Sequence, residues 1–344
     1  MNRFNQQFFI GKKKISASSP AFIVAEIGSN HNQSVRTAKK LIDVAAKAGV
    51  DAVKFQSLKF NQQYLEEKTS SSLKRLHQKI DFDDHLFVNL NKYCQKKGII
   101  FLSSPTYLES LSLLKKINMA AYKIASPITI GFTNLIAAAA KIGKPLIVST
   151  GYCDLPEIDR ALKSISSTRN RNLVLLHCVS SYPTKYEEIN LEYMKFLEKR
   201  YHCLVGYSDH SLSTSLPAVA VSLGARVIEK HFTLSRRSAG PDHYFALEPD
   251  ELTEMVKNIR ETEKALGNNR QLNAFEKKMK KIVMMKLVAA NDLNAGTILK
   301  KSDFIFRRAQ GGIEEYRLKD LVGTKLVSPI KKMKLVEWRN IIKK

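Results

Sequence analysis

Short apolar runs alternate with amphipathic stretches along most of the chain. Stretches such as TAKKLIDVAAKAG (37–49) and LPAVAVSLGA (216–225) have helical periodicity, and several end on a glycine, a helix C-cap signal. Eight such strand–helix units over about 240 residues are typical of a (β/α)₈ barrel, with a doubly wound sheet as the alternative. The apolar runs that predict strands are 22–27, 52–55, 99–102, 121–124, 146–148, 173–176, 204–207 and 227–228.

Each predicted strand ends on polar residues. Barrel enzymes carry their active sites at the carboxyl ends of the strands, whereas a doubly wound sheet has little reason to place polar groups at every strand end. We therefore favour the barrel. In chain order these residues are Glu26, Lys54 with Gln56, Ser103–Ser104, Lys123 with Ser126, Ser149–Thr150, His177 with Ser180, Ser208 with His210, and Glu229 with His231.

Two histidines are candidates for a metal site. His210 and His231 each end an apolar strand and are separated by 21 residues (231 − 210), about one strand–helix–strand unit. In a right-handed parallel unit the two strand ends lie side by side, so both imidazoles can face one cleft. Two histidine ligands with open positions suit a catalytic divalent ion, although strand-end histidines can also be purely structural.

Other strand-end residues predict an anion site. A set of lysines and hydroxyl groups suits a phosphate or carboxylate: Lys54, Lys123, Ser126, Ser149 and Ser208. Each lysine taken alone could bind an anion or could equally well form a structural ion pair. Together with the histidine pair, the two lysines favour a doubly charged anionic substrate.

Two carboxylates complete the candidate chemistry. Glu26 is a candidate general base or water-positioning group, and pairing with Lys54 is the structural alternative. Asp242, in the loop GPDH, is a candidate ligand of polyol hydroxyls, or a cap of the following helix. Three features occur together: an anion pocket, a carboxylate and a metal that can polarise a carbonyl. They suggest a lyase or synthase that joins an anionic small molecule to a carbonyl.

The remaining segments divide the chain. Residues 1–19 predict a hairpin that covers one end of the following domain, and 20–266 form the barrel. The polar stretch 57–82 is either a partial lid or an extra surface helix. Residues 267–282 have the composition of a linker, and 283–344 predict a compact, mostly β module that gains stability by docking on something larger.

Composition narrows the class of protein. The net charge of +24 comes from lysines spread over nearly every predicted helix, without interleaved aromatics. A solvated basic surface that draws in an anionic substrate is therefore favoured over nucleic-acid binding. The chain has neither a membrane-length apolar run nor a signal-peptide core, and its four cysteines show no paired short spacing. We expect a cytoplasmic protein without nucleic-acid or membrane partners.

The motifs resemble those of the sialic acid (N-acetylneuraminate) synthases and their legionaminic and pseudaminic acid relatives. AEIGSNHN, VKFQ, YKIAS, VSTG, HCVSSYPT, GYSDH, EKHFT and GPDH occur in that family's order, and the tail VAANDLNAG…IFRRAQGGI…LVGTKL resembles its C-terminal antifreeze-like (SAF) domain. The resemblance implies condensation of phosphoenolpyruvate with N-acetylmannosamine or a related N-acetylated hexose, giving a nonulosonic acid and phosphate.

The same resemblance implies roles for individual residues. His210 and His231 fall on the ligands of a divalent metal, most often Mn²⁺. Lys54, Lys123, Ser126, Ser149, Ser180 and Ser208 fall on the phosphoenolpyruvate side, and Glu26, Gln56, Tyr182 and Asp242 fall on the sugar and water side. It further implies a homodimer in which Arg308 of a swapped SAF domain helps to hold the sugar. The family pattern is not kept at Gln33, Ser235, Met284–Met285 and Ala309.

Several functions remain open at this point. The acceptor sugar is N-acetylmannosamine or, for a legionaminate or pseudaminate synthase, a diacetamido-trideoxyhexose. A related aldolase that makes 3-deoxy sugar phosphates is a further alternative, but it needs a second phosphate site, and no extra arginine cluster stands at the strand ends. The alternative from another class is a non-catalytic, basic binding protein on a relic barrel.

Overall fold

A computed structural model describes residues 3–83, 85–267 and 270–342, with the side chain of Ile342 left out of the description. The chain forms two compact units, Met1–Leu266 and Gly267–Lys344. The outermost residues of the predicted hairpin and of the predicted C-terminal module (1–2 and 343–344), and residues 268–269 of the predicted linker, lie outside the description.

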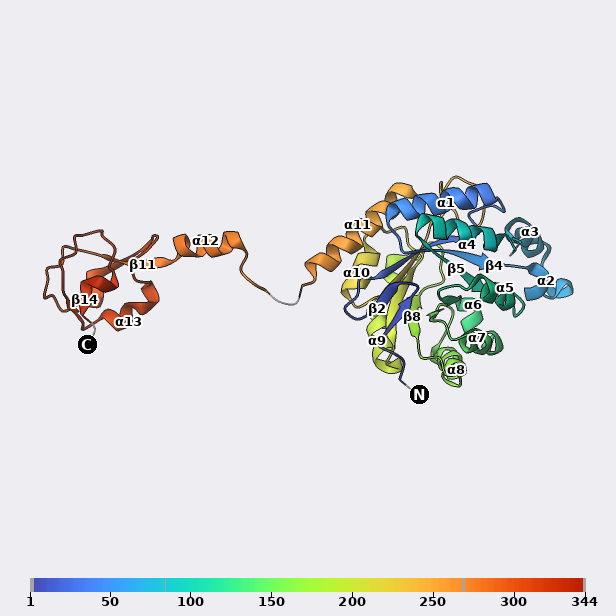
Figure 1. Cartoon of the computed structure of the whole chain (residues 1–344), viewed down its shortest axis with the longest axis horizontal. Helices are drawn as coiled ribbons and strands as arrows, with labels where there is room; N and C mark the ends of the chain where they lie inside the picture. The colour runs from blue at the N-terminus through green and yellow to red at the C-terminus, as the bar shows by residue number, and fades with distance from the viewer. Residues whose placement is uncertain (1–2, 84, 268–269, 343–344) are drawn as a thin grey trace. The chain divides into compact units, whose positions relative to one another are not determined.

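The first unit is a (β/α)₈ barrel, as predicted (Figure 1). Its eight strands are parallel and follow the order β5-β4-β3-β10-β9-β8-β7-β6, and the two ends of this order, β5 and β6, lie in contact. The doubly wound alternative is wrong, because strands that follow one another in the sequence also lie side by side around the whole sheet. The strands are β3 (Phe22–Gly28), β4 (Ala52–Ser57), β5 (Ile100–Pro105), β6 (Tyr122–Ile124), β7 (Leu146–Ser149), β8 (Leu173–Cys178), β9 (Leu204–Asp209) and β10 (Val227–His231).

Helices surround the strands, because an all-parallel sheet needs both faces covered (Figure 1). Helix α1 shows how the sequence encodes them: Ser34 caps its first turn by accepting from Thr37 N–H, and Gly49 ends it with φ +83°. The helices of this unit are α1 (Val35–Ala48), α2 (Phe60–Gln63), α3 (Ser71–Ile80), α4 (Leu86–Lys97), α5 (Ser110–Ile117), α6 (Ser126–Thr129), α7 (Thr133–Lys141), α8 (Leu155–Ser166), α9 (Tyr193–Tyr201), α10 (Leu216–Ser222) and α11 (Pro249–Ala265), with 3₁₀ turns at Glu66–Lys68 and Tyr186–Glu188.

An N-terminal hairpin closes the amino end of the barrel, as predicted. Strands β1 (Gln7–Ile10) and β2 (Lys13–Ser16) pair antiparallel around Gly11 and Lys12. Phe8, Ile10 and Ile15 pack in one buried cluster with residues that begin the barrel strands, such as Phe22 and Leu204. The hairpin therefore seals the end of the barrel opposite to the polar strand ends.

The segment 57–82 forms extra helices, one of the two predicted alternatives, and the partial lid stays a prediction. It forms α2, the 3₁₀ turn Glu66–Lys68 and α3, so it adds helices to the regular barrel. It also contributes Leu58, Tyr64 and Ile80 to the walls of the cavity described below. We call residues 58–81 the β4 insertion.

The second unit has its own buried core, formed by residues such as Leu287, Leu299 and Leu326. The predicted linker contains a helix that the composition did not reveal: Asn273 caps α12, accepting from Glu276 N–H at 2.8 Å. The elements of this unit are α12 (Ala274–Val283), β11 (Met285–Ala289), β12 (Phe304–Arg308), α13 (Leu318–Leu321), β13 (Lys325–Leu326), β14 (Ile341–Ile342) and 3₁₀ turns at Lys301–Asp303, Glu315–Arg317 and Trp338–Asn340. Throughout the described ranges, every helix is too short or too polar to cross a lipid bilayer.

Candidate active site

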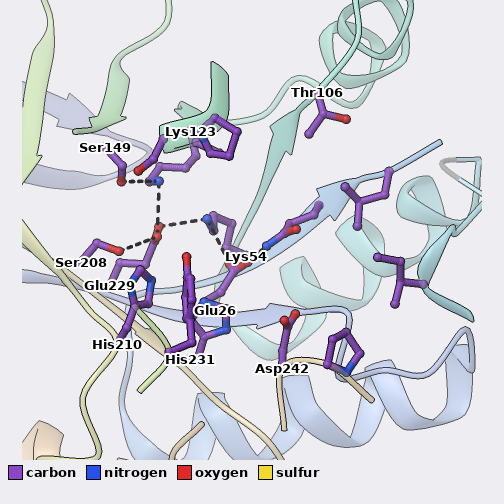
Figure 2. A pocket seen from close by; sticks show the side chains of 18 of the residues that line it. Glu26, Lys54, Thr106, Lys123, Ser149, Ser208, His210, Glu229, His231 and Asp242 are labelled. Atoms are coloured by element: carbon purple, nitrogen blue, oxygen red, sulfur yellow. Dashed lines mark hydrogen bonds and ion pairs between the residues drawn. The ribbon is translucent and has the colours of Figure 1, made fainter. Parts of the chain in front are cut away.

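A cavity of about 390 Å³ opens at the carboxyl ends of the barrel strands (Figure 2). Nearly all the predicted site residues of the barrel line it, although they come from segments more than 200 residues apart in the sequence. They are Glu26, Lys54, Gln56, Lys123, Ser126, Ser149, Tyr182, Ser208, His210, His231 and Asp242.

Glu229 stands at the centre of the charged part of this cavity (Figure 2). Its Oε2 lies 3.2 Å from Lys54 Nζ and its Oε1 lies 3.3 Å from Lys123 Nζ. Ser208 Oγ donates to the same Oε1 at 3.1 Å. One buried carboxylate from β10 therefore holds two lysines that come from β4 and β6.

The two lysines have further partners. Lys54 Nζ lies 3.2 Å from Glu26 Oε2, and Lys123 Nζ donates to Ser149 Oγ at 2.7 Å. Both lysine side chains are at most 3% exposed. The ion pair between Glu26 and Lys54 was the structural alternative for Glu26, and it coexists with a position on the cavity wall.

Burial and charge shift the pKa values of the two carboxyl groups in opposite directions. Burial raises the pKa of Glu26 to about 7, against the opposing effect of Lys54. Burial also acts on Glu229, but Lys123 and Lys54 outweigh it and hold its pKa at about 2. Glu229 is therefore a permanent anion, whereas Glu26 exchanges its proton near neutral pH, as a general acid or base must.

The two histidines face each other, with ring centroids 5.3 Å apart. His210 Nδ1 lies 2.8 Å from the backbone carbonyl of Val179, an arrangement that leaves its Nε2 free as a ligand. The Nδ1 of His231 is buried and has no hydrogen-bond partner among the described residues. Burial, together with His210 and Lys54, lowers the pKa of His231 well below its usual value, so this imidazole is neutral.

This pair fits a metal that takes its other ligands from substrate and water. Neutral imidazole is the form that binds a metal. Within the described part of the chain, no group of three or more His, Cys, Asp or Glu side chains is placed to hold an ion. These residues therefore do not suit a structural metal held entirely by protein ligands. They suit a metal held by two histidines, with its other positions open.

A second set of polar groups converges around Gly28. The β3–β4 register shifts between Glu26 and Gly28, and Gly28 has φ +53°. A Cβ at Gly28 would lie 2.7 Å from Asp242 Oδ2 and 3.3 Å from Glu26 Oε1. Gln56 Nε2 donates to that Glu26 oxygen at 2.6 Å. Glycine therefore allows three polar side chains to meet at one point of the wall.

Asp242 does not cap the following helix. Glu248 is the N-cap residue of α11, and Asp242 Oδ2 instead accepts from the backbone N–H and the hydroxyl of Ser29 at 3.1 and 2.8 Å. The capping alternative is therefore wrong. These bonds hold the Asp242 carboxylate against the cavity.

Ser180 and Arg308 are not among the residues that line the cavity. Ser180 nevertheless lies near a lining residue, since a Cβ at Gly151 would be 2.2 Å from Ser180 Oγ and 2.8 Å from Oγ of Ser126, which lines the cavity. Arg308 ends β12 in the second unit and is exposed. Its proposed contact with a sugar in a partner subunit stays a prediction.

The sequence did not assign several residues of the cavity. Glu229 was recognised at a strand end, but nothing in the sequence showed that it pairs with both lysines. Cys178 lines the cavity at 3.9 Å from His210 Nδ1, and the β4 insertion adds Tyr64 and His77. The polar ends of β8 and β10 were the available signals for Cys178 and Glu229. For the insertion, the polar stretch suggested a partial lid but singled out neither Tyr64 nor His77.

Comparisons with known proteins agree with this geometry. The model of the NeuB family matches residues 41–271, and the model of the SAF domain matches residues 286–340. An uncharacterized protein of Methanocaldococcus jannaschii is 37% identical over 97% of this chain and 98% of its own length. The N,N'-diacetyllegionaminic acid synthase of Campylobacter jejuni is 37% identical over 88% of this chain and 94% of its length.

Two solved structures are also similar to this chain. The N-acetylneuraminic acid (sialic acid) synthetase of Leptospira borgpetersenii, in complex with citrate, has a TM-score of 0.72 and 34% identity. The match covers 81% of this chain and 96% of that one. The spore coat polysaccharide biosynthesis protein SpsE of Bacillus subtilis has a TM-score of 0.69 and 31% identity, over 98% and 99% of the two chains.

Proposed function

The chain belongs to the NeuB family, the sialic, legionaminic and pseudaminic acid synthases, and on that premise we propose that it condenses phosphoenolpyruvate with an N-acetylated hexose. The products would be a nonulosonic acid and inorganic phosphate. The observation that supports this proposal best is the pair of buried lysines beside two facing histidines in one cavity.

The charged end of the cavity suits phosphoenolpyruvate. Lys54 and Lys123 contact different carboxylate oxygens of Glu229, and hydroxyl groups of Ser149 and Ser208 lie within hydrogen-bond distance of this network. A carboxylate and a phosphate on adjacent atoms of one small molecule need such closely spaced donors. Preorganised charges of this kind stabilise negative charge that develops during a reaction.

The proposed reaction balances with water as the third reactant. The electrons of the C2=C3 double bond of phosphoenolpyruvate form the new C–C bond from C3 to the carbonyl carbon of the open-chain sugar, and the carbonyl oxygen takes a proton and becomes a hydroxyl. Water adds at C2, and phosphate leaves with cleavage of the C–O bond. We assign to Glu26 the role of accepting the proton of that water, a role that its pKa of about 7 and its hydrogen bond from Gln56 support.

We propose Mn²⁺ as the cofactor, held by His210 and His231. When bound, a divalent ion supplies Lewis acidity toward the sugar carbonyl. The histidines themselves are kept in a suitable state: His210 is oriented by the Val179 carbonyl, and burial keeps His231 neutral. The metal's remaining positions are left to substrate and water, consistent with only two protein ligands.

The alternatives receive less support from the cavity. A 3-deoxy sugar phosphate synthase needs a second phosphate site, and among the described residues of the barrel that line this cavity there is no arginine. A non-catalytic binding protein does not require a buried charge network at the strand ends. A homodimer and the trans position of Arg308 remain proposals that rest on the family resemblance, and a cytoplasmic location remains a proposal that rests on the sequence pattern.

Phosphate release tests the proposed reaction directly. Purified protein with phosphoenolpyruvate, Mn²⁺ and N-acetylated hexoses should release phosphate only when a sugar acceptor is present. Phosphoenolpyruvate labelled with ¹⁸O in its bridging position should deliver the label to phosphate. Label retained in the sugar acid would contradict C–O cleavage, and failure of all acceptors would contradict the proposed function.

A further inference from the structure

A buried ion pair stands directly before the two histidines in the sequence. Asp209 is the last residue of β9 and is followed by His210, and Lys230 precedes His231, the last residue of β10. Lys230 Nζ lies 2.6 Å from Asp209 Oδ2, and both side chains are 0% exposed. Neither is among the described residues that line the cavity, because successive side chains of a strand point to opposite faces.

The Asp209 carboxylate has further partners around His210. Its Oδ1 accepts from Ser211 N–H at 2.8 Å and from the Tyr207 hydroxyl at 3.1 Å. Lys230 Nζ also donates to the Ser211 carbonyl at 2.5 Å. The residues on both sides of His210 are therefore held by one network, and Lys230 anchors that network on β10.

The network lies where the backbone pairing of the two strands ends. The register of β9 and β10 runs from Tyr207 opposite Ile228 to Asp209 opposite Lys230. The two histidines come directly after this last pair. The side-chain bonds therefore continue the link between the strands toward the point at which the two imidazoles must keep their distance.

His231 depends on this link more than His210 does. His210 Nδ1 lies 2.8 Å from the Val179 carbonyl, which orients its ring. The Nδ1 of His231 has no hydrogen-bond partner among the described residues. The position of the His231 ring is therefore set by packing, as against Phe245 with ring centroids 4.7 Å apart, and by the position of β10.

A buried ion pair of this kind contributes little net stability. The cost of moving both charges out of water offsets most of their attraction, and apolar residues of similar size often stabilise a protein equally well. The best-attested role of such a pair is to fix one register of the elements that it joins. A metal site needs a fixed register, because its ligand distances must hold to within about 0.2 Å.

We infer that Asp209 and Lys230 are positioning residues, which set the spacing of His210 and His231 for the divalent metal. The inference rests on the proposed function, since it assumes the proposed metal at that histidine pair. Changing the ion pair should therefore weaken metal binding, although neither of its side chains lines the cavity.

Mn²⁺ binding tests this inference without turnover. The full chain is titrated with Mn²⁺ in the presence of phosphoenolpyruvate and without sugar, and free Mn²⁺ is measured by electron paramagnetic resonance. The double variant Asp209→Asn/Lys230→Met leaves no unpaired buried charge. It should bind Mn²⁺ roughly tenfold more weakly than the wild type, as is typical when groups that orient metal ligands are changed. Asp209→Asn alone should act in the same direction and gives a second test in case the double variant folds poorly.

The kinetics of the double variant give a second measurement. The Mn²⁺ concentration for half-maximal phosphate release should rise by the same factor as the dissociation constant. The KM of phosphoenolpyruvate at saturating Mn²⁺ should stay at the wild-type value, a separation that a general loss of stability would not produce.

Asp51→Asn is the matched control. The Asp51 side chain is 5% exposed and pairs with Lys13 and Arg260 at 2.8 and 3.1 Å, at the opposite end of the barrel. This variant should lose stability toward urea and keep its Mn²⁺ affinity. Wild-type Mn²⁺ affinity in both Asp209 variants, or an equal loss of affinity in Asp51→Asn, would overturn the inference and leave the proposed function standing.

A failure of the metal assignment itself would look different. If the wild type binds no Mn²⁺, or if His210→Ala binds it as tightly, the inference falls together with the proposed metal site. Phosphate release from phosphoenolpyruvate in the presence of a sugar then still decides on the proposed condensation.

Discussion

The substitution Glu229→Gln would remove one negative charge from the centre of the cavity while nearly preserving the shape of the side chain. The carboxylate is about 5% exposed and lies 3.2 and 3.3 Å from two lysine ammonium groups. Glutamine can still accept a hydrogen bond from Ser208. Lys54 would then keep Glu26 as its carboxylate partner, whereas Lys123 would keep its hydrogen bond to Ser149.

The size of the effect follows from these distances. At an effective dielectric constant near 20, each contact corresponds to about 5 kcal/mol of Coulomb energy, most of which offsets the loss of hydration. Removing one partner of a buried ion pair typically costs about 3–5 kcal/mol. Because burial already lowers the pKa of Lys123, that lysine can lose its proton in the variant. We therefore expect a loss near the lower end of this range at pH 7.

The predicted loss has a defined pH dependence. The folded-state pKa of Glu229 is about 2, below its ordinary value of 4.5. Its charge therefore stabilises the native state fully above pH 4.5, and this contribution disappears as the pH falls toward 2. The difference in unfolding free energy between wild type and Glu229→Gln should shrink over the same interval.

Urea unfolding measures this difference in the two units separately. Far-UV circular dichroism reports chiefly the helix-rich barrel, and the single tryptophan, Trp338, reports the second unit. Phosphoenolpyruvate should stabilise Glu229→Gln more than wild type, because it supplies the missing negative charge. Glu192→Gln is the matched control: its ion pair with Lys195 measures 2.9 Å but is mostly exposed, so its loss should cost no more than about 1 kcal/mol. Equal losses in both variants, with equal stabilisation by phosphoenolpyruvate, would refute the reasoning.

Four further predictions concern the site. His210→Ala should abolish condensation and weaken phosphoenolpyruvate binding in calorimetry without changing the circular dichroism; near-normal activity after chelation would contradict the metal assignment. In the wild type, kcat/KM should fall as the pH drops below about 7, because Glu26 becomes protonated, and Glu26→Gln should lose this dependence along with most of the rate. Gly28→Ala should raise the KM of the sugar tenfold or more, measured by phosphate release, because a Cβ would meet Asp242 Oδ2 at 2.7 Å; an unchanged KM would refute this. Arg308→Ala should raise the KM of the sugar far more than that of phosphoenolpyruvate, and mixing it with His210→Ala should restore part of the activity; no recovery despite proven subunit exchange would count against a swapped dimer.

The positions of the site residues in the barrel followed from the sequence because of simple geometry. Parallel strands in a barrel end at one rim, so residues such as Lys54, Lys123 and His231 had to meet there once the strands were recognised. The partners of each side chain could not be predicted in this way. That Glu229 on β10 reaches a lysine from β4 and another from β6 depends on strand tilt and side-chain length, which a pattern of apolar and polar residues does not contain.

Two local features show different reasons for incomplete prediction. Helix α12 had a signal, Asn273 three residues before Glu276, which is a capping box. The lysine-rich composition obscured it. The β4 insertion had no such signal for its position, because the bonds that fix it join Gln33 to Gln78 and Asp81, 45 and 48 residues away.

The charges of the cavity give a physical reason for the proposed metal. Lys54 and Lys123 bring two positive charges, and Glu229 cancels one of them; Glu26, with its pKa of about 7, cancels part of the other. Phosphoenolpyruvate brings a carboxylate and a phosphate that carries nearly two charges of its own. The protein alone therefore leaves the bound substrate with an excess of buried negative charge, which is costly. A divalent ion held by His210 and His231 would restore the balance, so substrate affinity as well as turnover should depend on it.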